Sequence, residues 1–167
     1  MPKEEVLKKS KLLFDNFINS DLYKNAKTVM LYFPLGNEPD TRLLFDKLFY
    51  DKKTVLLPVT LDDEITPVVI NEETEFEPGS YRIFEPKIKI PYTEDAIDIV
   101  IVPGIAFDRH GSRVGFGKGC YDKFLQKIKA IKIGYCYSFQ VSNEIETSEF
   151  DIGMDYLITE SEMIVCE

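Results

Sequence analysis

The stretch Ile97-Asp98-Ile99-Val100-Ile101-Val102-Pro103 (IDIVIVP, residues 97–103) decides the fold of this chain. It is short, almost entirely apolar, and closed by proline and glycine at 103 and 104. Runs of this kind are typical of strands that are buried on both faces of a parallel sheet. The stretch therefore predicts an inner strand of a mostly parallel sheet.

Helical and strand-like segments alternate on both sides of this run. Helices are indicated by apolar residues at helical spacing, such as Val6, Leu13 and Phe17, and strands by short apolar runs that stop at turn formers. The expected order is helix 4–19, strand 27–33, helix 40–50 with Asp40 or Thr41 as N-cap, strand 54–59, strand 97–103, a helix from about Cys120 to Ala130, strand 131–137 and strand 156–159. Four prolines in residues 61–91 predict only short strands and turns there.

This alternation predicts an α/β fold: a three-layer, mostly parallel open sheet with helices on both faces. We expect one domain over residues 1–167. Parallel sheets of this type bind ligands at the carboxyl ends of their strands. The chemistry is therefore expected on residues 34–40, after the first strand, and on residues 104–119, after the IDIVIVP strand.

Composition excludes several classes of protein. The 44% apolar and 29% charged residues are close to globular averages, which argues against disorder. Three unclustered cysteines, Cys120, Cys136 and Cys166, favour reduced thiols over a zinc site. We find neither a 20-residue apolar run nor a signal peptide, so we expect a cytoplasmic protein. The net charge of -9 would repel nucleic acid and anionic membranes, and neither is an expected partner.

One segment departs from this acidic balance. Residues 108–123 carry four basic side chains against two acidic ones, and they contain the run RVGFGKGCYD at residues 113–122. Alternating glycines just before a helix allow backbone N–H groups to converge on an anion, and the positive end of the helix dipole adds to this. Lys118 and Arg113 would contribute full charges. The run predicts a phosphate-binding loop, although a purely structural glycine turn remains an alternative.

The run matches neither of the two best-known phosphate loops. A Walker loop requires Ser or Thr after the Gly-Lys pair, and Ser112 stands where its first glycine should fall. A dinucleotide fingerprint requires glycine where Cys120 stands. Asp122, in the first helical turn, could bind Mg²⁺ or simply stabilise the helix dipole.

At this point the sequence resembles the 5-formyltetrahydrofolate cyclo-ligase (methenyltetrahydrofolate synthetase) family. The likeness depends mainly on residues 102–108 (VPGIAFD) running into residues 111–122 (GSRVGFGKGCYD). Further agreement lies at residues 32–38 with 40–41, 57–58, 79–86, 134–140 and 151–160. The resemblance implies a Rossmann-like sheet similar to the NagB/RpiA/CoA-transferase folds.

The resemblance also implies a reaction. The family closes 5-formyltetrahydrofolate to 5,10-methenyltetrahydrofolate with ATP and Mg²⁺ and releases ADP and phosphate. Transfer of the γ-phosphoryl group to the formyl oxygen creates a leaving group, and the neighbouring nitrogen of the folate then attacks the formyl carbon. The implied partners are ATP and the folate, with or without a polyglutamate tail, bound by a monomer.

Residue roles follow from the same resemblance. The catalytic residues would be Lys118, Arg113 and Glu38, and the metal ligands would be Asp122 and, more weakly, Asp151. The ATP phosphates would contact Arg113, Val114, Gly115, Phe116, Gly117, Lys118, Gly119, Cys120 and Tyr121. The folate would contact Phe33, Glu38, Tyr81, Phe116 and Tyr121. On residue type alone, Glu38 could equally be a solvated loop acid, Tyr81 a packing residue, and Asp151 a helix cap or an exposed acid.

Two departures from the family pattern leave alternatives open. The family's extra N-terminal helix, which carries ATP-binding Lys and Arg residues, is expected to be absent, since Lys3, Lys8 and Lys9 belong to the next helix. Cys120 stands where tyrosine is common, and a nucleophilic pair with His110 is conceivable. The alternatives to the ligase are a folate- or nucleotide-binding protein without turnover and a sugar-phosphate or CoA-ester enzyme.

Overall fold

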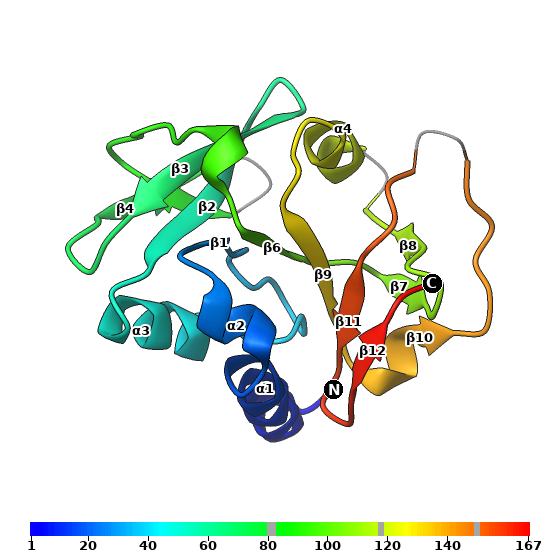
Figure 1. Cartoon of the computed structure of the whole chain (residues 1–167). Coiled ribbons are helices and arrows are strands. Elements are labelled where there is room, and N and C mark those ends of the chain that lie inside the picture. Colours follow the sequence, from blue (N-terminus) through cyan, green and yellow to red (C-terminus); the bar gives the residue numbers. More distant parts are fainter. Residues whose placement is uncertain (80–82, 117–118, 149–150) are drawn as a thin grey trace.

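Strand β6 (Ile99–Val102), within the IDIVIVP stretch, lies inside a seven-stranded sheet of order β12-β11-β9-β6-β1-β2-β3 (Figure 1). This computed structural model describes residues 1–79, 83–116, 119–148 and 151–167. The other strands of the sheet are β1 (Thr28–Met30), β2 (Thr54–Leu61), β3 (Glu64–Ile70), β9 (Ile131–Tyr135), β11 (Tyr156–Ile158) and β12 (Met163–Val165). The helices are α1 (Lys3–Ile18), α2 (Asp21–Asn25), α3 (Arg42–Tyr50) and α4 (Cys120–Gln126).

The five inner strands are parallel, and each edge strand is antiparallel to its neighbour. Strand β1 pairs with β2 on one side and with β6 on the other. Strands β2 and β3 therefore lie on one side of β1, and β6 with the later strands of the sheet lies on the other side. Such a reversal of strand order leaves a crevice at the carboxyl ends of β1 and β6, and open α/β sheets usually bind their ligands in a crevice of this kind.

Side chains on the inner strands alternate between two apolar cores. On β6, Ile99 and Ile101 pack in the core that contains the helix residues Leu13 of α1 and Leu44 of α3. Val100 and Val102 pack in the other core, with Phe124 of α4. Figure 1 shows α1, α2 and α3 on one side of the sheet and α4 on the other. The predicted three-layer α/β architecture is therefore confirmed.

Local expectations were confirmed for most helices and inner strands, with differences at their ends. The apolar face predicted for the first helix, with Val6, Leu13 and Phe17, is buried. Thr41 is the N-cap of α3, but its hydroxyl donates to Tyr32 O, and the first-turn N–H of Arg42 is accepted by Asp40 instead. The helix expected as far as about Ala130 ends at Gln126, because the N–H of Lys127 turns back to Phe124 O.

The proline-rich region is more regular than expected. Strand β3 forms a hairpin with β2 across Asp62 and Asp63, both in the left-handed region, and residues 90–92 bond along its outer edge. Strands β4 (Phe76–Pro78) and β5 (Phe84–Pro86) make a second hairpin.

Sequence periodicity missed several short elements. These are α2, β12, and a small sheet of β7 (Ala106–Asp108), β8 (Arg113–Val114) and β10 (Val141–Ser142). The described residues also form two 3-10 turns, η2 (Glu94–Ala96) and η3 (Ser138–Gln140). None of the helices in the described ranges has the length and apolar character needed to cross a membrane.

Candidate functional site

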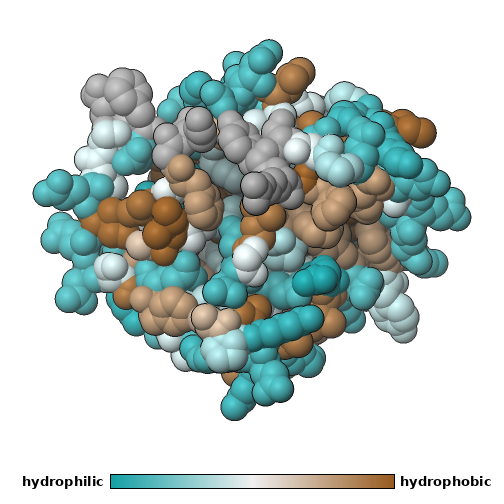
Figure 2. All heavy atoms as spheres, turned by 180° about the vertical axis from the view of Figure 1, so that it is seen from behind, coloured by the Kyte–Doolittle hydropathy of each residue, from teal (hydrophilic) through white to brown (hydrophobic). Residues whose placement is uncertain are grey.

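A cavity of about 720 Å³ opens at the carboxyl ends of β1 and β6. The loop after β1 contributes Phe33, Gly36 and Glu38, and the end of β6 contributes Pro103. The segment before and at the start of α4 contributes Arg113, Gly115, Phe116, Gly119, Cys120, Tyr121 and Asp122, and Asp151 also lines it. The two loops expected from the sequence thus line one cavity. On the face seen in Figure 2, hydrophobic side chains gather around a hollow in the middle and hydrophilic ones occupy the periphery.

Arg113 is the most buried cation of this cavity, because only 4% of its side chain is exposed. Its Nη1 donates to Pro103 O at 3.1 Å, and its guanidinium lies over the Tyr121 ring at 5.5 Å. Its Nη2 is 3.7 Å from Asp122 Oδ1, and its buried Nε has no hydrogen-bond partner among the described residues. Burying a cation costs solvation free energy, and this cost is greater when one of its N–H donors has no partner. A buried cation with such a donor is typical of anion-binding sites.

Two glycines of this loop occupy positions where a side chain would be unfavourable. Gly119, the N-cap of α4, has φ of 70°, which a residue with a Cβ adopts only with strain. A Cβ added to Gly115 would lie 2.8 Å from Arg113 Nη1. The loop therefore passes close to the guanidinium only because residue 115 has no side chain.

Tyr121 and Phe116 supply aromatic surface to the cavity. Burial raises the pKa of Tyr121, so its hydroxyl remains protonated at neutral pH. Phe116 is 62% exposed, which is costly for a phenyl ring and leaves it accessible to a ligand. Both residues line the cavity, and the contacts with folate and nucleotide that the family resemblance implies for them stay predictions.

Asp122 and Asp151 lie on the same side of the cavity. Asp122 Oδ1 accepts from Ile152 N at 3.3 Å, directly next to Asp151 along the chain, and Asp151 Oδ2 accepts from Ser148 N at 2.9 Å. In the described ranges no cluster of three or more His, Cys, Asp or Glu could hold a metal. A Mg²⁺ ion takes only one or two carboxylates and completes its shell with phosphate and water, so the assignment of Asp122 and Asp151 as metal ligands stays a prediction.

Glu38 lies in the loop after β1 and is partly buried. Its Oε1 accepts from Leu35 N at 2.7 Å, and Glu38 N donates back to Leu35 O at 3.0 Å. Burial raises the pKa of Glu38, and the hydrogen bond from Leu35 only partly opposes this. Glu38 thus lines the cavity with a partly buried carboxyl group, and its role towards a ligand stays a prediction.

Phe33 belongs to an aromatic cluster with ring centroids 6.4 Å from Phe45, 6.2 Å from Phe76 and 6.0 Å from Phe84. Sequence reasoning missed Phe84, which lines the cavity and is 49% exposed. The available signal was its position in residues 79–86, one of the segments that resembles the family.

Some predicted site residues are not among the described residues that line this cavity. Gly117, Lys118 and Tyr81 lie outside the described residues. Val114 is exposed and does not line the cavity in the described structure. Cys120 lines it, whereas the His110 ring contacts the main-chain oxygen of Glu167 and lies outside the lining residues. The structure therefore gives no support to a Cys120–His110 pair.

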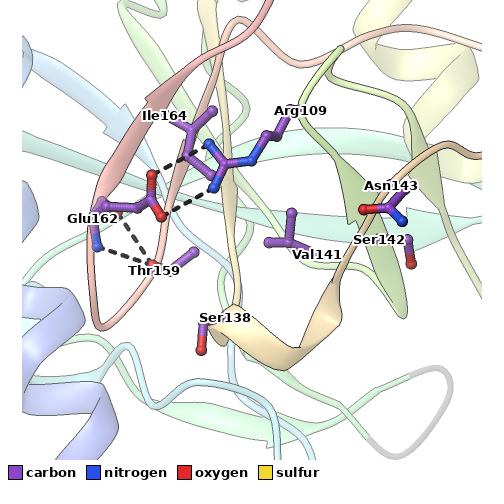
Figure 3. Close-up of a pocket in the computed structure, with 8 residues that line it drawn as sticks. All are labelled: Arg109, Ser138, Val141, Ser142, Asn143, Thr159, Glu162 and Ile164. Carbon is purple, nitrogen blue, oxygen red and sulfur yellow. Dashed lines mark hydrogen bonds and ion pairs between the residues drawn. The ribbon is translucent and has the colours of Figure 1, made fainter.

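A second, smaller cavity of about 280 Å³ lies beside β12 and β10 (Figure 3). Its one lining guanidinium, on Arg109, already pairs with both carboxylate oxygens of Glu162 at 3.3 and 3.1 Å. Among the described residues, none of those predicted from the sequence as site residues lines it.

The sequence profile of the 5-formyltetrahydrofolate cyclo-ligase family matches residues 1–160. The chain belongs to this family. The resemblance seen in the glycine-rich run and its neighbouring segments is thereby confirmed.

Individual members of the cyclo-ligase family are similar over most of the chain. The probable 5-formyltetrahydrofolate cyclo-ligase of Schizosaccharomyces pombe is 31% identical over 161 residues, covering 85% of this chain and 79% of the relative. The 5-formyltetrahydrofolate cyclo-ligase of Mus musculus is 24% identical over 176 residues, covering 94% and 85%. The NMR structure of Aquifex aeolicus 5,10-methenyltetrahydrofolate synthetase superposes with a TM-score of 0.89 at 33% identity, covering 99% of this chain and 84% of that one.

Proposed function

We propose that this chain uses ATP to convert 5-formyltetrahydrofolate to 5,10-methenyltetrahydrofolate, releasing ADP and phosphate. Membership of the cyclo-ligase family supports the reaction and the use of ATP. The observation in the structure that carries the proposal is Arg113, whose buried guanidinium, with no partner for Nε among the described residues, lines the same cavity as the partly buried Glu38. A phosphate-binding cation and an acidic, aromatic-lined wall are what a triphosphate and a pterin require of one site.

The chemistry needs alignment more than a protein nucleophile. The formyl oxygen of the substrate is a poor leaving group until it receives the γ-phosphoryl group of ATP. Ring closure then forms a carbon–nitrogen bond and releases phosphate. Phosphoryl transfer depends on positioning and on neutralisation of charge, and the proposed residues supply both.

The nucleotide half of the site is assigned to the glycine-rich segment. Arg113 neutralises the phosphates from inside the cavity, and the backbone of residues 114–116 and 119–121 follows them, with Gly115 allowing the close approach. Lys118 is assigned to the transferring phosphoryl group on the basis of the family motif alone. Together these groups place positive charge where the γ-phosphoryl group moves.

The folate half is assigned to the wall built by the loop after β1. Glu38 accepts hydrogen bonds from the pterin or steers the formyl group, and its desolvation strengthens such bonds. Phe33 and Phe84 pack against the flat ring system, Phe116 and Tyr121 close the side next to the nucleotide, and Tyr81 remains a folate contact by resemblance.

Magnesium is proposed as the ion that accompanies ATP. Asp122 and Asp151 would hold it, since both line the cavity and Asp122 Oδ1 accepts from Ile152 N, the residue next to Asp151. The ion would neutralise phosphate charge during the transfer. Asp122 keeps its carboxylate in place by accepting from Ile152 N, which orients it independently of any ion.

The test is a direct assay of turnover. Purified chain, Mg²⁺ and 5-formyltetrahydrofolate are mixed with and without ATP, and the absorbance of methenyl-folate is followed together with release of phosphate. The proposal expects both signals to rise in a one-to-one ratio only when ATP is present. Binding of both ligands with no product would show a binding protein instead, and product without ATP would show a different enzyme class.

A further inference from the structure

The residues that follow β9 contact both ligand loops of the cavity. This segment runs from Tyr137 through the turn η3 (Ser138–Gln140), about 100 residues beyond the loop after β1. It contributes no residue to the lining of the 720 Å³ cavity as described. Its role must therefore be sought in what it holds in place.

One contact reaches the loop that carries Glu38. The Tyr137 hydroxyl donates to Asn37 O at 2.8 Å, immediately before Glu38. Tyr137 is 2% exposed, and its burial raises its pKa to about 12, although a hydrogen bond with the Ser10 side chain partly opposes this shift. The hydroxyl thus stays protonated at neutral pH and remains a hydrogen-bond donor.

The other contact reaches the turn between β6 and the glycine-rich segment. Gln140 Nε2 donates to Gly104 O and to Ile105 O, both at 3.0 Å. Ile105 N donates in turn to Val114 O at 2.8 Å, next to Arg113, which itself donates to Pro103 O. The side chains of Gln140 and Arg113 therefore hold three consecutive carbonyl groups at the base of the nucleotide loop.

The two contacts are joined within the turn. Tyr137 N donates to Gln140 Oε1 at 2.9 Å and Gln140 N donates to Tyr137 O at 3.0 Å. The amide of Gln140 consequently has its oxygen fixed by Tyr137 and its nitrogen fixed by the 104–105 turn. A continuous chain of hydrogen bonds runs from Asn37 to Val114 through the side chains of Tyr137 and Gln140.

We propose that Tyr137 and Gln140 are positioning residues that hold the folate-binding loop and the nucleotide-binding loop at the spacing that phosphoryl transfer requires. This inference rests on the proposed function. The formyl oxygen and the γ-phosphorus sit on different loops, and a displacement of about 1 Å between reacting groups can cost roughly 100-fold in rate. Neither residue lines the cavity as described, and both contact the loops that do.

Two substitutions open the link at opposite ends. Tyr137→Phe removes one hydroxyl group and keeps the ring, which is stacked on Phe139 at 5.3 Å. Gln140→Glu keeps the oxygen that accepts from Tyr137 N and removes the donor to Gly104 and Ile105. Each variant should lower kcat about 10-fold to 100-fold, while the dissociation constants for Mg-ATP alone and for the folate alone change less than about twofold, since each loop remains intact.

The double variant is the decisive measurement. Because both substitutions break the same link, Tyr137→Phe/Gln140→Glu should lose about as much kcat as the worse single variant, and not the product of the two losses. Ser138→Ala is the matched control, as Ser138 lies in the same turn but its hydroxyl donates to Glu160 instead of either loop; its kcat should equal that of the parent.

Single variants with parental kcat, or losses that multiply in the double variant, would overturn the positioning role. So would a loss confined to the affinity for one substrate, which would make the residue a local support of one loop. Absence of turnover in the parent chain would instead refute the proposed function. The positioning role would then be judged by whether ATP changes the Kd of the folate in the parent and not in the variants.

Discussion

Nη2 of Arg113 lies 3.7 Å from Oδ1 of Asp122, so the proposed phosphate ligand and the proposed metal ligand form an ion pair across the start of α4. The pair is sheltered on the arginine side, where 4% of the side chain is exposed, and open on the aspartate side, at 27%. We therefore expect a Mg-nucleotide to replace this internal contact with two stronger ones, between its phosphates and the guanidinium and between its ion and the carboxylate.

Arg113→Lys should raise the KM for ATP about tenfold or more, because an ammonium group cannot reproduce the planar fork of the guanidinium. The measurement is turnover against ATP concentration at saturating folate, with calorimetric titration of Mg-ATP. Arg109→Lys is the control, since Arg109 is in the same segment but is exposed and pairs with Glu162. Equal ATP constants in the two variants would remove Arg113 from the nucleotide site.

Lys118→Ala should lower kcat at least about 100-fold, which corresponds to roughly 3 kcal/mol of transition-state stabilisation. The melting temperature should change little, as loop lysines seldom contribute to folding stability. Lys123→Ala, an exposed lysine of α4, should retain parental kcat. Normal turnover in the Lys118 variant would contradict its assignment to the transferring group.

Glu38→Gln should raise the KM for the folate about tenfold or more through loss of a charged hydrogen bond, with the KM for ATP unchanged. It should also change the pH dependence of stability. The pKa of Glu38 is raised in the folded chain, so its contribution to stability is complete below the ordinary carboxyl pKa and is lost as the pH rises through the raised value.

Glutamine still accepts from Leu35 N but carries no charge. The melting temperature of the Glu38→Gln variant relative to the parent should therefore increase from about pH 4 to pH 7. Differential scanning calorimetry at several pH values measures this, and a constant difference would show that Glu38 is not desolvated in solution.

Asp108→Asn should destabilise the chain by about 2 kcal/mol or more. Asp108 is 1% exposed, and its carboxylate accepts from the N–H groups of His110, Ser112 and Ile145, which fixes the turn before Arg113. An asparagine would present an NH₂ group to at least one of these donors. Denaturant unfolding measures the change, with the exposed Asp95→Asn as control.

Lowering the pH should change the stability of the parent chain and of the Asp108→Asn variant by different amounts. Burial raises the pKa of Asp108, but the three backbone N–H groups outweigh it, so the pKa is lowered overall. Its stabilising contribution is therefore present above the ordinary carboxyl pKa, about 3.9, and is lost as the pH falls through the lowered value. The parent should lose more stability than the Asn variant between pH 5 and pH 2, and parallel curves would contradict the lowered pKa.

The sequence by itself determined the features that depend on neighbours along the chain. The apolar run at residues 97–103 is short and ends at proline and glycine, which is typical of a doubly buried strand, and β6 is such a strand. Turn formers after two strands marked both loops of the cavity, and Gly119 adopts the left-handed conformation that a glycine before a helix allows. These signals are local, because secondary structure and turn chemistry depend on a few adjacent residues.

Only the tertiary structure decided which side chains act together. Nothing in the run RVGFGKGCYD indicates that Arg113 is buried with no partner for Nε among the described residues, or that a Cβ at residue 115 would lie against that guanidinium. The contact of Tyr137 with Asn37 joins residues 100 apart and exists because β9 and β1 flank β6 in one parallel sheet. Packing energies and long-range hydrogen bonds are set by the assembled layers, and no local pattern of residues contains them.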